Sequence, residues 1–114
     1  KIEYNTGLKE IHHTNKLDAP SGTAITLAED ILKYSDYKEW SLQKKDDNTL
    51  QISSFRKGEI PGTHEVSYFS DIDEISIKHK AFNRDGFALG AVIAAEWILN
   101  KKGVFSMKDV LNIT

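Results

Sequence analysis

Apolar residues recur at helical spacing in two stretches of the chain, and each stretch predicts a helix. The first is predicted over residues 22–34, with the apolar positions Ala24, Ile25, Leu27, Ala28, Ile31 and Leu32. The second is predicted over residues 84–100, where apolar side chains nearly encircle the helix, so we expect burial on more than one side. We expect Gly103 to end this helix and a short helical piece to follow over residues 105–113.

Alternating apolar and polar residues predict strands over residues 2–13, 50–57, 63–70 and 74–82, with a short irregular strand at 39–43. Gly7 indicates a bulge or turn in the first strand. His79 falls on the apolar face of the last strand, which is typical of a core or interface histidine. The last three strands follow one another through short links, so we expect an antiparallel meander. The predicted fold is α+β, a mixed open sheet of about four strands with helices packed on one face.

The composition changes this picture little but excludes several classes of protein. The 114 residues are 39% hydrophobic and 28% charged, which is typical of one ordinary globular domain. A net charge of −2 without a basic run argues against a nucleic-acid partner. The chain has no cysteine, so it has no disulfide, and this fits the cytoplasm. The most apolar stretch, residues 87–99, is too short to cross a membrane, so we expect no membrane partner.

The stretch from Glu10 to Ala24 concentrates the candidate chemistry. Pro20 interrupts the chain, and Ser21 then stands where a helix cap belongs, with Asp18 as a second possible cap. The first turn, with Gly22 and Thr23, has unpaired backbone N–H groups at the positive end of the helix dipole. Such a turn binds anions, and a carboxylate is the natural ligand.

Three side chains just upstream add charge and proton exchange to this turn. Lys16 carries a full positive charge, and His12 and His13 exchange protons near neutral pH. The simpler interpretation is that two histidines end a strand and Pro-Ser-Gly-Thr only caps a helix. Adjacent strand residues point to opposite faces, which disfavours joint metal binding by the two histidines. A serine hydrolase is disfavoured because the G-x-S-x-G pattern is absent, and the acidic turn at 71–73 lacks a calcium-loop spacing. We therefore expect no metal.

Three segments resemble the dihydrodipicolinate reductase (4-hydroxy-tetrahydrodipicolinate reductase) family, in the right order along most of the chain. The first and most specific is His12-His13-x-x-Lys16-x-Asp18-Ala19-Pro20-Ser21-Gly22-Thr23-Ala24. The second is His79-Lys80-Ala81-x-x-Arg84-x-x-Phe87-Ala88-x-Gly90-Ala91. The third is the tail Gly103-x-Phe105-x-Met107-x-Asp109-Val110-Leu111.

The resemblance implies an oxidoreductase that transfers hydride from NADH or NADPH to a cyclic dicarboxylate in lysine and diaminopimelate biosynthesis. It assigns proton transfer to His12 and Lys16, and substrate binding to His13, Lys16, Ser21, Gly22 and Thr23. It places Arg84 near the cofactor, although a surface ion pair is an equal alternative. It implies a cytoplasmic homotetramer joined through the sheet face, where Phe55 and Phe69 accompany Lys78 and Lys80.

In this family a Rossmann domain precedes the histidine motif, and no G-x-G-x-x-G fingerprint occurs here. We therefore expect residues 1–114 to be the substrate-binding, catalytic and oligomerisation domain, with residues 104–114 packing on the missing domain. Alone, the chain is expected to be inactive. Thr14 and Asn15 stand where relatives often carry basic residues, which weakens the expected anion attraction. Two alternatives stay open: an oligomerisation module without ligand binding, and another nicotinamide-dependent reductase with the same sheet domain.

Overall fold

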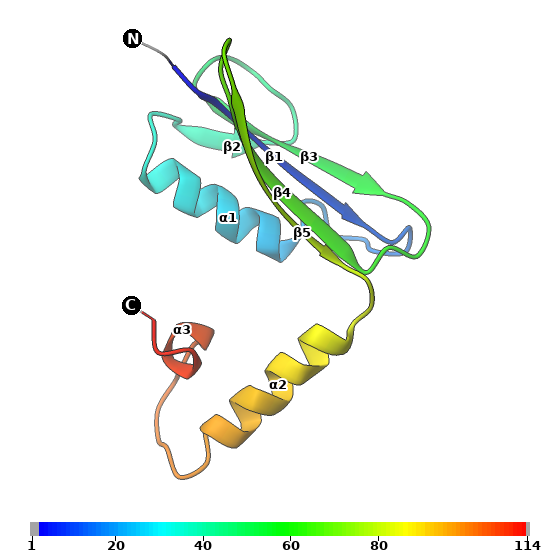
Figure 1. Ribbon diagram of the computed structural model, residues 1–114, viewed down its shortest axis with the longest axis vertical. Coiled ribbons are helices and arrows are strands. Elements are labelled where there is room, and N and C mark those ends of the chain that lie inside the picture. The colour runs from blue at the N-terminus through cyan, green and yellow to red at the C-terminus, as the bar shows by residue number, and fades with distance from the viewer. Residues whose placement is uncertain (1–2, 114) are drawn as a thin grey trace. The chain divides into compact units, whose positions relative to one another are not determined.

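The computed structural model describes residues 3–113 and divides into two compact units, Lys1–Phe82 and Asn83–Thr114. The first unit holds one sheet and one long helix (Figure 1). Its elements in chain order are β1 (Asn5–His12), α1 (Gly22–Lys33), β2 (Glu39–Ser41), β3 (Thr49–Arg56), β4 (Gly62–Phe69) and β5 (Glu74–Ala81). The second unit holds α2 (Asp85–Trp97) and α3 (Met107–Val110).

The five strands form a mixed sheet in the order β2-β3-β1-β4-β5. β1 is parallel to β3 and antiparallel to β4, so it separates two strands that are neighbours in sequence. The predicted meander of the last three strands is therefore wrong, and only β4 and β5 form a hairpin. Directly after β3, the Lys57 N–H donates to the carbonyl of His12, the last residue of β1, at 2.9 Å.

β1 is a regular strand. Its pairing with β4 runs without interruption from Asn5 opposite Phe69 to Ile11 opposite Thr63. The predicted bulge at Gly7 is wrong, because Gly7 takes its regular place opposite Ser67. Ile2, the other predicted end of this strand, lies outside the described residues.

α1 begins as predicted, with Ser21 as its cap: the Ser21 hydroxyl accepts a hydrogen bond from the Ala24 N–H at 3.2 Å. The helix lies on one face of the sheet (Figure 1). Its small residues Ala24 and Ala28 are fully buried and allow close packing. They form the core together with Leu8, Leu50 and Ile52. Tyr37 and Trp40 pack against this core and hold the predicted short strand, β2, in place.

The confirmed fold class is α+β with a mixed open sheet, and β2 brings the number of strands to five. β5 is the exposed edge of the sheet, so His79 is not a core residue of this chain. In the second unit, α2 has no buried residue, and the prediction of burial on several sides is wrong for the single chain. α2 also ends at Trp97, before Gly103, and Asn100 takes a left-handed conformation at φ 64°. Within residues 3–113, none of the helices combines the length and the apolar character needed to span a membrane.

Candidate functional site

The site is built around Glu10, a carboxylate that is 0% exposed in the middle of the sheet. β1 alternates so that Leu8, Glu10 and His12 share the face covered by α1. Arg56, at the end of β3, binds the carboxylate with both terminal nitrogens, Nη1 to Oε1 and Nη2 to Oε2. A bidentate pair of this kind fixes the orientation of both groups.

Two further donors converge on the same carboxylate. The Ser21 N–H donates to Glu10 Oε2 at 2.5 Å, and His12 Nδ1 lies 3.2 Å from Glu10 Oε1. Burial raises the pKa of the Glu10 carboxyl, but hydrogen bonds from Arg56, Ser21 and His12 outweigh it and lower that pKa to about 2. Glu10 is therefore a carboxylate throughout the physiological range of pH.

Arg56 also holds the loop between β1 and α1. Its Nη2 donates to the Asp18 carbonyl at 2.5 Å, and its Nε donates to the Lys16 carbonyl at 3.3 Å. This loop contains the cis peptide bond between Ala19 and Pro20. One guanidinium thus connects β3, the buried carboxylate and the backbone that leads into α1.

His64 joins the cluster from β4, the neighbour of β1 on the side away from β3. It pairs with Glu10 in the sheet register, and its Nε2 lies 2.9 Å from the Ser21 hydroxyl oxygen. That oxygen accepts from Ala24, so the hydroxyl hydrogen is free to point to His64. Burial, and next the neighbouring His12, lower the pKa of His64. The two imidazole rings meet edge to face, 5.1 Å apart.

The first turn of α1 keeps two donors free. Gly22 and Thr23 are exposed, and among residues 3–113 their backbone N–H groups have no hydrogen-bond partner. The N–H groups of Ser21 and Ala24 on either side are already used. The Lys16 ammonium lies 3.0 Å from the Asp18 carboxylate, and this hydrogen bond lowers the pKa of Asp18. The arrangement offers an anion two backbone donors, with an imidazole on the adjoining strand end.

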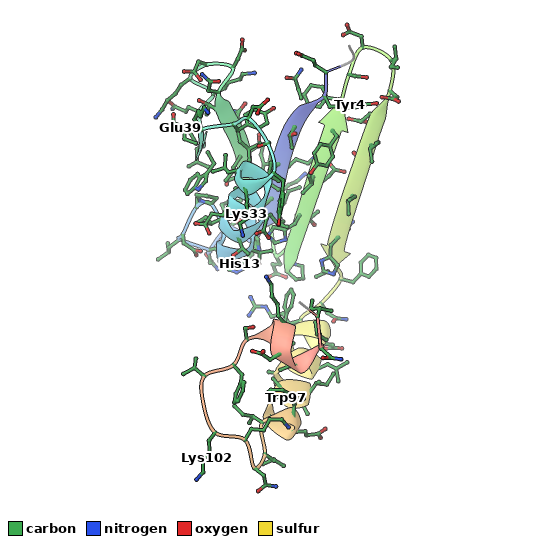
Figure 2. All side chains as sticks on the ribbon, turned by 90° about the vertical axis from the view of Figure 1, so that its left-hand side faces the viewer. Tyr4, His13, Lys33, Glu39, Trp97 and Lys102 are labelled. Atoms are coloured by element: carbon green, nitrogen blue, oxygen red, sulfur yellow. The ribbon has the colours of Figure 1, made fainter. Side chains whose placement is uncertain are left out.

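Of the predicted residues, the structure brings His12 and Ser21 into one hydrogen-bonded cluster around Glu10. Gly22 and Thr23 follow directly, and Lys16 lies in the loop that Arg56 holds. β1 ends at His12, so His12 and His13 need not point to opposite faces of a regular strand. His13 lies just beyond this end, at the opposite end of the strand from Tyr4 (Figure 2). Arg84 precedes α2 in the second unit and makes no capping side-chain hydrogen bond. Its role and those of the substrate ligands stay predictions.

Three members of the cluster were not predicted, namely Glu10, Arg56 and His64. The signal for Glu10 is a charged residue between Leu8 and His12 on the face of a strand that is otherwise buried, where an ion needs a partner. Arg56 was not identifiable as that partner, because its proximity depends on the parallel pairing of β1 with β3. Within the part of the chain that the structure describes, no three His, Asp or Glu side chains gather as metal ligands do.

Comparison with known proteins identifies relatives of the whole chain. Residues 1–111 match the family model described as dihydrodipicolinate reductase, C-terminus. The 4-hydroxy-tetrahydrodipicolinate reductase of Christiangramia forsetii is 52% identical over 111 residues, which are 96% of this chain and 46% of that protein. The Buchnera aphidicola enzyme of the same name is 46% identical over 113 residues, 90% of this chain and 41% of that protein.

The fold is also found in a solved structure. It is the dipicolinate-bound dihydrodipicolinate reductase from Paenisporosarcina sp. TG-14, with a TM-score of 0.68 and 23% identity. The match covers 92% of this chain and 44% of that one. The chain therefore spans about half the length of the relatives it matches.

The lowered pKa of Glu10 predicts how stability depends on pH. Because the folded pKa lies below the unfolded one, the stabilisation is fully present above about pH 5 and is lost as the pH falls towards 2. We expect the free energy of unfolding to fall by about 3 kcal/mol through this group. Urea unfolding at several pH values should show this loss in the wild type and in Glu65→Gln, a control on the other face. Equal pH dependence in Glu10→Gln would contradict the prediction.

Proposed function

The chain belongs to the dihydrodipicolinate reductase C-terminus family, and on that premise we propose that it is the substrate-binding and catalytic part of a 4-hydroxy-tetrahydrodipicolinate reductase. The full-length enzyme converts 4-hydroxy-tetrahydrodipicolinate to tetrahydrodipicolinate in lysine and diaminopimelate biosynthesis: water leaves to give dihydrodipicolinate, which takes up one hydride and one proton. NADH or NADPH supplies the hydride. The chain spans 46% and 41% of the two reductases compared, so the activity belongs to a longer protein than these residues.

The observation that carries the proposal is the first turn of α1, where the exposed Gly22 and Thr23 have N–H groups without a partner among residues 3–113. Lys16 lies in the loop that leads into this turn, and Glu10 connects His12 to Ser21, the residue just before Gly22. Backbone donors at the start of a helix bind carboxylates, and a lysine adds attraction. The substrate is a dicarboxylate, and the related solved structure is named as dipicolinate-bound. In the proposal His13, Lys16, Ser21, Gly22 and Thr23 bind the carboxylates. Gly22 and Thr23 are the donors most available, because the Ser21 N–H and hydroxyl already have partners.

His12 and Lys16 supply the proton that the reduced substrate needs. His12 suits this role because Glu10 holds its Nδ1, and its Nε2, which lies beside Gly62, has no hydrogen-bond partner among residues 3–113. The chain itself does not fit the nicotinamide cofactor. The turn from β1 into α1 is Ala-Pro-Ser-Gly-Thr, and residues 3–113 contain no glycine-rich turn of the dinucleotide type. We therefore propose that sequence outside this chain binds the cofactor, with Arg84 as the one candidate contact from these residues.

Dipicolinate should bind at the start of α1. In a titration followed by NMR, we expect the largest amide shifts at Gly22 and Thr23, because their N–H groups become hydrogen-bonded. Lys16→Ala should weaken binding by about tenfold, the loss of one partly buried charge contact. Lys9→Ala removes a lysine from the other face, where it pairs with Glu65, and should leave binding unchanged. Saturating dipicolinate without a shift at Gly22 or Thr23 would exclude this site.

Replacement of His12 should separate chemistry from binding. In the full-length reductase, His12→Ala should lower kcat by about a hundredfold or more, the usual contribution of a positioned proton donor. Dipicolinate affinity, measured on the same preparation, should change little and shows that the site is intact. A fully active His12→Ala enzyme would remove the catalytic assignment.

The sheet face away from α1 is the proposed tetramer surface. Its apolar side chains include Phe55 and Phe69, which are 49% and 43% exposed, and β5 adds Lys78 and Lys80. Exposed aromatic residues on a sheet face are typical of an interface. Light scattering should therefore give the mass of four chains, and Phe55→Asp with Phe69→Asp should lower it. A monomeric wild type would contradict the assembly, and a tetramer that ignores dicarboxylates would favour the oligomerisation module.

A further inference from the structure

We propose that Glu10 is a positioning residue that couples the proton donor His12 to the anion-binding turn of α1. The inference rests on the proposed function and adds a role for a residue that touches neither substrate nor cofactor. Its basis is that the two oxygens of one buried carboxylate bind two different parts of the site.

Each oxygen of Glu10 serves one half of the site. Oε1 lies 3.2 Å from His12 Nδ1, and Oε2 accepts the Ser21 N–H at 2.5 Å. Ser21 is the residue directly before Gly22, so the position of Oε2 sets where the free N–H groups of α1 begin. Arg56 binds both oxygens and prevents the carboxylate from rotating. The imidazole and the carboxylate-binding turn are therefore held at one fixed separation.

The surroundings of His12 leave its ring little freedom. Nδ1 is fixed by Glu10, and on the other side Nε2 lies over Gly62, where an added Cβ would be only 3.0 Å away. The side chain is 12% exposed. The ring thus depends on Glu10 for its direction, in the same way that a buried carboxylate orients the histidine of a catalytic triad.

Neither glutamine nor aspartate can make all of these contacts. Four donors converge on Glu10, namely two from Arg56 and one each from Ser21 and His12. Glutamine has one acceptor and one donor end, so either orientation sets its NH₂ group against donors. In either orientation Glu10→Gln loses the contact to His12 or to Ser21, and also one of the two bonds from Arg56. The side chain is then free to rotate, so both halves of the site lose their fixed position. Aspartate keeps the charge but is one methylene shorter, about 1.5 Å, and cannot reach both.

The test measures both halves of the site in one variant of the full-length reductase. In Glu10→Gln we expect kcat to fall and the dissociation constant of dipicolinate to rise, each by about tenfold or more. In the NMR spectrum, the His12 ring and the Gly22 and Thr23 amides should shift together. Glu65→Gln, which removes a carboxylate paired with Lys9 on the opposite face, is the matched control and should change none of these.

A purely structural role for Glu10 would lower the folded fraction without changing kcat or affinity per folded molecule. If the unpaired guanidinium prevents Glu10→Gln from folding, Glu10→Gln with Arg56→Gln removes both charges of the buried pair and should show the same joint loss. A folded variant with unchanged kcat and affinity overturns the proposal, and so does a change in only one of them. Failure of the proposed function is distinct, because the wild type itself would then not bind dipicolinate at Gly22 and Thr23.

Discussion

The ion pair between Glu10 and Arg56 is the contact on which the rest of the site depends. A carboxylate without solvent exposure is costly unless its lone pairs are filled, and here four donors fill them. The same guanidinium binds two carbonyls of the loop that leads to α1. The loop, the helix start and the His12 ring are therefore all held through one pair of opposite charges.

The strand order places these two residues together. β3 is parallel to β1, so the carboxyl ends of both strands lie at the same end of the sheet, and Arg56 is opposite His12. β4 is antiparallel to β1, so its first residues bring Gly62 and His64 to this same end. The short loop before α1 places the helix start there too, with Ser21 bound to Glu10 and close to His64. A meander of β3, β4 and β5 would have separated Arg56 from Glu10.

The site combines fixed and free groups. The carboxylate, the guanidinium and the Ser21 hydroxyl have their partners within the chain and provide rigidity. Among residues 3–113 the N–H groups of the exposed Gly22 and Thr23 have no partner, and the Lys16 ammonium pairs with the exposed Asp18. Rigid support behind a few available donors is the arrangement that binds and orients a charged ligand with little loss of entropy.

The sequence by itself determined the local features. Ser21 as a cap and the spacing of Ala24 and Ala28 predict α1, and the motif from His12 to Ala24 indicates the family. The alternation of apolar and polar residues predicted the strands but not how they pair. Alternation shows which face of the sheet a residue takes, and not which strand lies beside it. The tertiary structure alone decided that β1 lies between β3 and β4. Only that order supplies Arg56 to Glu10, since a buried charge needs its counter-ion in space and not in sequence.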